Sequence, residues 1–168
     1  MARIIILNGS PRKKGSTASL IRSFREGAES AGNEVTEFYL NGMNIHPCIG
    51  CQRCRSGADP CAFKDDMGSI YRAFLECDVV VFASPMYWWT IDAQLLTAVD
   101  RLYALHSVYG IDKLKRKSVL IMTAGGDWYE NPVQWYSMFE KAIGWTDLGM
   151  ILGAGKEKEA KLLGASIS

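Results

Sequence analysis

The chain has 168 residues, of which 48% are hydrophobic and 22% are charged, and its formal net charge is +1 at pH 7. This length and composition are typical of one globular domain with a buried core, and the near-neutral charge excludes long-range attraction to nucleic acid or to an anionic membrane. The apolar run at residues 4–7 is too short for a signal peptide, and no segment approaches the ~20 apolar residues of a membrane span. We therefore expect a cytoplasmic protein with no nucleic-acid or membrane partner, whose cysteines stay reduced.

A β-branched run at residues 3–7 leads into a loop of glycine, serine and basic residues, which is followed by an apolar pattern of helical period. This order predicts a strand, a turn and a helix. Free N–H groups at the helix start, the helix dipole and the hydroxyls of Ser10, Ser16 and Thr17 make such a turn an anion site. The loop lacks the Gly-Lys-Ser/Thr of a triphosphate site, the three glycines of a dinucleotide site and a cysteine nucleophile. What remains is a phosphomonoester that is held but not attacked, or a well-capped turn with no ligand.

Beyond this loop, strand and helix patterns alternate along the chain. Strand patterns cover residues 3–7, 34–40, 78–83, 118–122 and 148–152, and helical patterns cover residues 19–31, 93–106 and 132–143, with another beginning at residues 65–66. Residues 41–64 contain four cysteines and have no sustained period, so we interpret them as an insertion loop within a single domain spanning residues 1–168. Five strands alternating with helices predict an α/β fold with a doubly wound parallel sheet, because crossovers are right-handed and helices must cover both faces.

Two later loops follow strands and are expected at the same edge of the sheet as the first loop. In an open parallel sheet, ligands bind beyond the carboxyl ends of the strands. One loop offers Tyr87, Trp88 and Trp89, and the other contains Gly125 and Gly126. Aromatic walls suit the faces of a flat ring, and glycines let backbone amides approach its heteroatom edge. Together with a phosphate loop, this combination favours flavin mononucleotide (FMN) over an ordinary nucleotide.

Two motifs carry a resemblance to a known family. The first motif is Asn8-Gly9-Ser10-Pro11-Arg12 with Gly15-Ser16-Thr17, and the second is Ser84-Pro85-Met86-Tyr87-Trp88 with Gln94-Leu95 and Asp100-Arg101. From residue 1 to about residue 152, the chain resembles the NADPH-dependent FMN reductase family of flavodoxin-like proteins. The resemblance implies a flavodoxin-like doubly wound five-stranded parallel sheet with strand order 2-1-3-4-5, FMN as the cofactor and NAD(P)H as the co-substrate.

The same resemblance assigns residues to the cofactor. It implies that Ser10, Arg12, Ser16 and Thr17 hold the FMN phosphate, that Pro85, Met86, Tyr87 and Trp88 border the ribityl chain and ring, and that Thr123, Gly125 and Gly126 face the ring. We expect no catalytic side chain, because the flavin itself carries the chemistry and passes electrons to a small-molecule or protein acceptor. An open ring face and an aromatic rim favour a homo-oligomer, either a dimer or a tetramer, with Trp89 and residues 93–106 as the candidate interface.

A cluster of cysteines forms the second strong signal in the chain. Cys48, Cys51 and Cys54 are separated by two-residue gaps, and Cys61 follows after six residues. This spacing lets three thiolates converge on one centre and a fourth reach it from a loop that turns back. It is similar to the compact motif of iron–sulfur flavoproteins, a branch of the same family, and that likeness implies a [4Fe–4S] cluster. Zinc, free thiols or a redox pair are the alternatives for these residues, and an iron–sulfur electron carrier or redox sensor is the alternative function.

Three further expectations concern single residues. Asp65 and Asp66 precede a helical pattern, so we interpret them as helix caps and not as an acid–base pair. Cys77 begins an apolar strand and is expected in the core.

Overall fold

The computed structural model describes residues 1–57 and 60–168, so residues 58 and 59 of the expected 41–64 loop lie outside the described part. Within it, the strands are β1 (Arg3–Asn8), β2 (Glu34–Tyr39), β3 (Val79–Tyr87), β4 (Thr90–Ile91), β5 (Lys117–Thr123) and β6 (Thr146–Leu152). Five of them form a parallel sheet in the order β2-β1-β3-β5-β6, and the short β4 pairs antiparallel with β3. The predicted order of the five parallel strands is confirmed, and β4 is an addition that the sequence does not predict.

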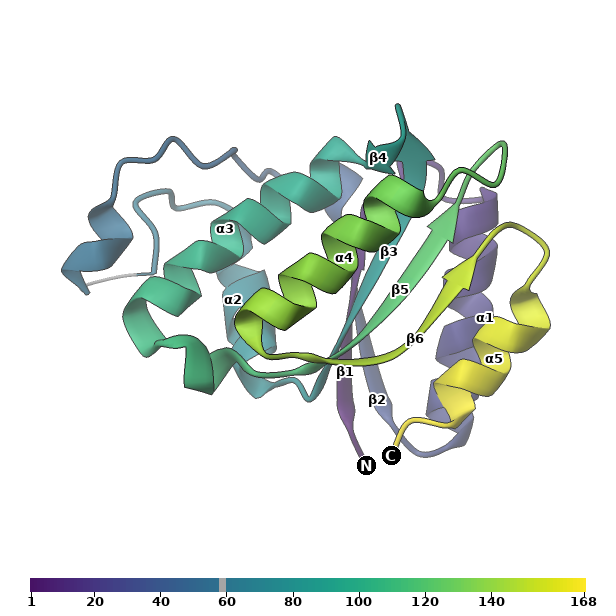
Figure 1. The fold of residues 1–168 in the computed structure, drawn as a ribbon. Helices are drawn as coiled ribbons and strands as arrows, with labels where there is room; N and C mark the ends of the chain where they lie inside the picture. The colour runs from purple at the N-terminus through teal and green to yellow at the C-terminus, as the bar shows by residue number, and fades with distance from the viewer. Residues whose placement is uncertain (58–59) are drawn as a thin grey trace.

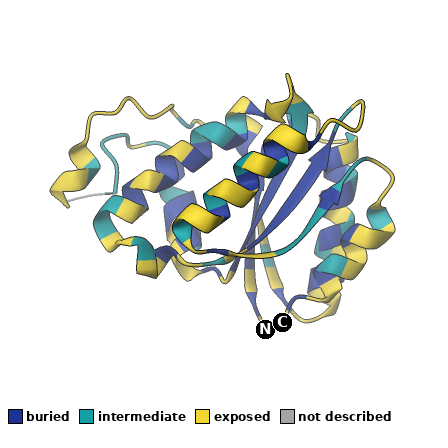
Figure 2. Ribbon diagram, in the orientation of Figure 1, coloured by how far each residue is buried: buried dark blue, intermediate teal, exposed yellow. Residues whose placement is uncertain are grey.

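Helices cover both faces of this sheet, as a doubly wound fold requires. They are α1 (Ser16–Ser30), α2 (Met67–Glu76), α3 (Ala93–Tyr109), α4 (Glu130–Ile143) and α5 (Glu157–Ala165), with short 3-10 turns η1 (Leu40–Gly42), η2 (Arg53–Ser56) and η3 (Ile111–Leu114). Helices α2, α3 and α4 lie on one face, and α1 and α5 lie on the other (Figure 1). The central strands are therefore buried along almost their whole length (Figure 2).

The apolar run of β1 shows how the sheet builds two cores. Successive side chains of a strand point to opposite faces. Ile4 and Ile6 join the core beneath α1 and α5, while Ile5 and Leu7 join the core beneath α2, α3 and α4. A strand with two apolar faces reads in sequence as a continuous apolar run, which is why the parallel arrangement is predictable.

Three loops meet at one edge of the sheet, where the parallel strands end (Figure 1). The register pairs Asn8 of β1 with Ala83 of β3, and Pro85 of β3 with Thr123 of β5. The loops after β1, β3 and β5 are therefore neighbours. The cysteine-containing segment lies elsewhere, beside α3 at the end of the molecule away from α1 and α5 (Figure 1).

Candidate functional site

The loop between β1 and α1 leaves the start of the helix open. Gly15 occupies the N-cap position without a side-chain capping bond, and the first turn of α1 contains no acidic residue. The loop holds its own shape, because the Ser10 N–H donates to Asn8 Oδ1 at 3.0 Å and the Arg12 N–H donates to Ser10 Oγ at 3.3 Å. Backbone N–H groups and the positive end of the helix dipole at an uncapped start suit an anion such as a phosphate ester.

Two threonine hydroxyls join the first loop to the third. Thr17 Oγ1 and Thr123 Oγ1 lie 2.7 Å apart, and both residues are buried. Only one of the two hydroxyl hydrogens can serve the bond between them, so the other remains available to a ligand oxygen. Ser10 is also buried, whereas Arg12 and Ser16 are exposed at the same loop.

A buried carboxylate supports the first loop. Asp92 caps α3 by accepting the Leu95 N–H at 3.0 Å, and it also accepts the Ser84 hydroxyl at 2.5 Å. A Cβ at Gly9 would overlap this carboxylate, so glycine is required where the loop crosses Asp92. Burial raises the pKa of Asp92 despite its hydrogen bonds. Asp92 is not among the residues predicted from the sequence, although an aspartate just before a helical pattern is an N-cap signal.

The second loop is a two-residue hairpin turn between β3 and β4. Trp88 and Trp89 occupy it with φ of 50° and 58°, in the left-handed region that favours glycine and asparagine. Trp88 is 87% exposed, and its ring lies 5.2 Å from that of Trp89, edge to face. Before the turn, Pro85 and Met86 are half-buried and Tyr87 is exposed. The predicted aromatic residues are therefore displayed at the edge of the sheet.

The third loop leaves free space beside its glycines. A Cβ at Gly125 would meet no atom within 4 Å, and one at Gly126 would only touch the Trp128 ring at 3.4 Å. Trp128 is 67% exposed, whereas Tyr129 is buried. An uncapped helix start with buried hydroxyls, next to an open glycine loop, fits a phosphate ester that carries a flat ring. The structure thus brings the predicted cofactor residues onto three neighbouring loops.

The cysteine-containing segment packs against α3. Cys48, Cys51, Cys54 and Cys61 line one small pocket together with Arg101, and all four are free thiols. The thiol donor set suits an iron–sulfur or zinc centre, and a buried guanidinium beside it suits the negative charge of such a centre. Within residues 1–57 and 60–168, however, no three histidine, cysteine or acidic side chains are gathered as metal ligands.

Asp65 does more than cap a helix. Its Oδ1 accepts the Met67 N–H at 3.2 Å, but its carboxylate also forms a buried ion pair with Arg101 at 2.8 Å. Burial by itself raises the pKa of Asp65, yet the hydrogen bonds from Arg101 and from the backbone outweigh it and hold the pKa below its usual value. Asp66 stands at the N-cap position without a capping bond and instead accepts the Asn44 N–H at 2.7 Å. Asp66 thus occupies the predicted cap position without a capping side-chain bond, and Asp65 caps the helix but also pairs with Arg101. Cys77 is buried as predicted.

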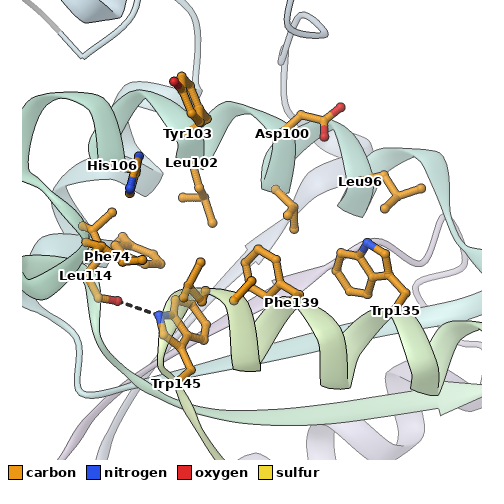
Figure 3. A pocket seen from close by; sticks show the side chains of 14 residues that line it. Phe74, Leu96, Asp100, Leu102, Tyr103, His106, Leu114, Trp135, Phe139 and Trp145 are labelled. Carbon is orange, nitrogen blue, oxygen red and sulfur yellow. Dashed lines mark hydrogen bonds between the residues drawn. The ribbon is translucent and has the colours of Figure 1, made fainter.

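A separate apolar cavity of about 430 Å³ lies between α3 and α4. In Figure 3, Leu102 of α3 and Phe139 of α4 point into it from opposite sides, and Trp145 donates from Nε1 to the Leu114 carbonyl oxygen at 2.7 Å. None of the predicted cofactor residues lines this cavity. It is therefore distinct from the loop edge.

The open parallel sheet, with helices on both faces and three loops at its carboxyl edge, is that of the flavodoxin-like α/β proteins. Residues 2–131 match the family model described as NADPH-dependent FMN reductase, so the chain belongs to that family. The resemblance carried by the two loop motifs is confirmed, and FMN with NAD(P)H as co-substrate is the chemistry of the family. No helix in the described residues has the length and apolar character needed to cross a membrane.

Individual relatives agree with this assignment. An iron–sulfur flavoprotein of Archaeoglobus fulgidus is 34% identical over 94 residues, which are 56% of this chain and 42% of that protein. The Bacillus subtilis protein YwqN, whose name describes an NAD(P)H-dependent FMN-containing oxidoreductase, is 26% identical over 166 residues, covering 91% of this chain and 85% of that one. The chain spans about half the length of the iron–sulfur flavoproteins it matches.

The fold is shared with solved oxidoreductase structures. The NAD(P)H:quinone oxidoreductase of Methanothermobacter marburgensis superposes with a TM-score of 0.71 at 16% sequence identity, covering 98% of this chain and 96% of that chain. At this level of identity the likeness establishes the common fold.

Proposed function

We propose that this chain is an FMN-dependent oxidoreductase in which NAD(P)H delivers hydride to the flavin and a second acceptor removes the electrons. The observation that carries the proposal is the uncapped start of α1, with the buried Thr17 and Thr123 hydroxyls beside it. Bound FMN would supply the hydride and electron transfer chemistry itself. The side chains and amides of the chain have the tasks of binding, orienting and shielding it.

Each loop has a separate task in this proposal. The first loop would hold the phosphate through its amides and through Ser10, Arg12, Ser16 and Thr17. The second would border the ribityl chain and the ring with Pro85, Met86, Tyr87 and Trp88. The third would present backbone amides to the ring edge from Thr123, Gly125 and Gly126. None of these tasks requires a side chain that gains or loses a proton.

The test is anaerobic reduction of the purified, FMN-loaded chain by NADH or NADPH, followed by addition of an acceptor. The flavin absorbance should bleach with nicotinamide and return with ferricyanide or a quinone. A flavin that binds tightly but stays oxidised under excess nicotinamide would contradict the reductase proposal. Protein that takes up no FMN at saturating supply would contradict the site as well.

An iron–sulfur electron carrier or redox sensor is the second candidate, because all four cysteines line a single pocket. Here a [4Fe–4S] cluster on Cys48, Cys51, Cys54 and Cys61 would exchange electrons with partners, and nicotinamide would not be turned over. Anaerobic purification with iron, sulfide and zinc analysis separates a cluster from zinc and from free thiols. A turnover assay on the same sample separates a carrier from a reductase.

We also propose a homodimer or homotetramer that works in the reducing cytoplasm. Trp89 and the outer surface of α3 support this assembly, since Trp89 is 50% exposed and Tyr103 of α3 is 52% exposed. Light scattering of the purified chain would measure the assembly size. A monomer at micromolar concentration would contradict it.

A further inference from the structure

Arg101, in the middle of α3, ties the two ends of the cysteine-containing segment together. Its Nη1 and Nη2 donate to the two Asp65 carboxylate oxygens at 2.8 and 3.0 Å, and Nη1 also donates to the His46 carbonyl oxygen at 2.6 Å. Asp65 accepts the His46 N–H at 3.0 Å. The pair therefore holds both backbone polar groups of His46. The side chains of Arg101 and Asp65 are only 1% and 2% exposed.

Further contacts join the two ends of this segment, residues 44–46 and 63–66, which together are called the stem. The Asn44 N–H donates to Asp66 Oδ2 at 2.7 Å, and the Asp66 N–H donates to the Asn44 carbonyl oxygen at 3.1 Å. The His46 ring stacks on Phe63 with centroids 5.1 Å apart, and the Arg101 guanidinium carbon lies 5.1 Å from the Phe63 centroid. The chain between the two ends, described at residues 47–57 and 60–64, is called the cysteine loop below.

Stability of the core alone does not explain the buried Arg101–Asp65 pair. Two buried charges lose hydration, and well-packed apolar residues in their place are often equally stable. This pair joins α3 to both ends of a segment in which Cys48 and Cys51 are exposed. Its effect is therefore to fix where the loop begins and ends against α3.

One donor of Arg101 is left over. Its Nε is buried without a hydrogen-bond partner, and it is the only buried side-chain nitrogen or oxygen in that condition within residues 1–57 and 60–168. A buried donor without a partner is costly and rare in native structures, so an added acceptor at this nitrogen would be favourable. Arg101 lines the same pocket as the four cysteines. Thiolates bound to a metal retain negative charge and accept such N–H donors.

We infer that Arg101 is the positioning residue of the cysteine loop: its pair with Asp65 closes the loop against α3, and its Nε–H donates to a sulfur of a thiolate-ligated metal centre held there. The inference rests on the second candidate function proposed above, a metal centre on the four cysteines, and does not depend on the flavin chemistry. It makes α3 a part of the cysteine site, although none of the four cysteines lies on that helix.

The test uses the full-length, FMN-loaded and fully reduced protein with Co²⁺ alone as the probe, because cobalt–thiolate bonds absorb strongly in the near ultraviolet. Arg101→Lys keeps the positive charge but removes the Nε–H and the two-pronged contact with Asp65. Competition with a chromophoric chelator should show roughly a 10–100-fold loss of Co²⁺ affinity, the usual effect of removing a group that orients metal ligands. Arg55→Lys, at an exposed position of the same loop, is the matched control and should bind as the wild type does.

A second variant controls for misfolding of the first. A single unpaired charge in this buried site is strongly unfavourable and could itself unfold the chain. Arg101→Met combined with Asp65→Asn removes both charges together, and circular dichroism with FMN titration reports whether each variant folds. Without metal, hydrogen exchange at residues 46–57 should be at least roughly tenfold faster in the folded variants, because the stem is open.

Three outcomes would overturn the inference. One is a wild-type protein that binds no Co²⁺ through its thiols. Another is a folded Arg101 variant with wild-type affinity and wild-type exchange. The third is loss of FMN affinity and of helical structure in both variants, which would assign the pair to the stability of the whole fold. Reduction of the flavin by NAD(P)H is measured separately, so failure of the reductase proposal would be recognised as such.

Discussion

At the scale of single residues, Thr17 is the most direct test of the phosphate site. Thr17→Val keeps the shape of the side chain but removes the hydroxyl that pairs with Thr123. FMN should bind about 1–3 kcal/mol more weakly, because a charged phosphate oxygen loses a hydrogen bond. Fluorescence titration measures the change. Thr36→Val, at an exposed position on β2, is the control, and equal FMN affinity in the two variants would contradict the assignment.

Two glycines should respond differently to added side chains. Gly125→Val places its methyl groups in open space, so the fold should keep its stability while FMN affinity falls about tenfold, or by ~1.4 kcal/mol. Gly9→Ala meets the Asp92 carboxylate, and overpacking of this kind should lower the free energy of unfolding by about 1–3 kcal/mol. Urea denaturation and FMN titration on both variants separate the two effects. A Gly125→Val variant that is less stable but binds FMN as the wild type does would contradict the proposal that Gly125 faces the flavin ring.

At the scale of elements, the turn between β3 and β4 stores backbone strain. Trp88 adopts a left-handed φ of 50° while its ring is 87% exposed, so little burial compensates for the conformation. Trp88→Asn supplies the residue that this position of a two-residue hairpin prefers, and it should stabilise the fold by about 0.5–1 kcal/mol. The same variant should bind FMN more weakly if the ring borders the flavin. Thermal unfolding with and without FMN measures both changes, and a less stable apo-protein would contradict the strain argument.

Helix α4 is joined to the sheet through a buried acid. Glu140 accepts the Ser118 hydroxyl of β5, and its burial raises its pKa, even though hydrogen bonds from Ser118 and Tyr136 act in the opposite direction. The folded chain therefore binds more protons than the unfolded chain between the ordinary glutamate pKa and the raised value. Across that interval, the free energy of unfolding should fall as pH rises.

Glu140→Gln keeps an oxygen for Ser118 but cannot ionise. Its free energy of unfolding should fall much less with pH than that of the wild type. The stability of the variant relative to the wild type should therefore increase as pH rises. Urea denaturation at a series of pH values from about 4 to 7 covers the region above the ordinary glutamate pKa. Parallel pH profiles for the two proteins would contradict the prediction that the pKa of Glu140 is raised in the folded chain.

At the scale of the whole molecule, the sheet was predictable because its signals are local. Val79, Val80 and Val81 of β3 form an uninterrupted apolar run, which is typical of a strand covered on both faces. The first loop was likewise predictable from its glycine and hydroxyl residues next to a strand and a helix. Strand β4 was not, because its two residues are too few for a period and its turn depends on the backbone conformation of Trp88 and Trp89.

The contacts around the cysteines could not be predicted from local sequence patterns, for another reason. Asp65 stands before a helix and therefore resembles a cap, but its main partner, Arg101, is 36 residues away in the chain. A side-chain pair at that separation has no periodic signature and exists only once α2 and α3 are packed. The same holds for Thr17 and Thr123, which are 106 residues apart. The cysteines and the loop hydroxyls were thus recognisable in the sequence, whereas the long-range side-chain pairs that position them were not.

The contact between α1 and α5 has a consequence for how this protein can vary. A Cβ at Gly27 would collide with the backbone of α5 at Lys161, and one at Gly164 would collide with the backbone of α1 at Phe24. Beside the first loop, the Ser19 hydroxyl of α1 donates to Glu157 of α5 at 2.9 Å. Because main chain meets main chain, no rotamer can absorb a substitution there. Helix α5 therefore fixes the position of α1, the helix whose first turn is the proposed phosphate site. A methyl group added at either glycine should push the two helices apart and so disturb that site.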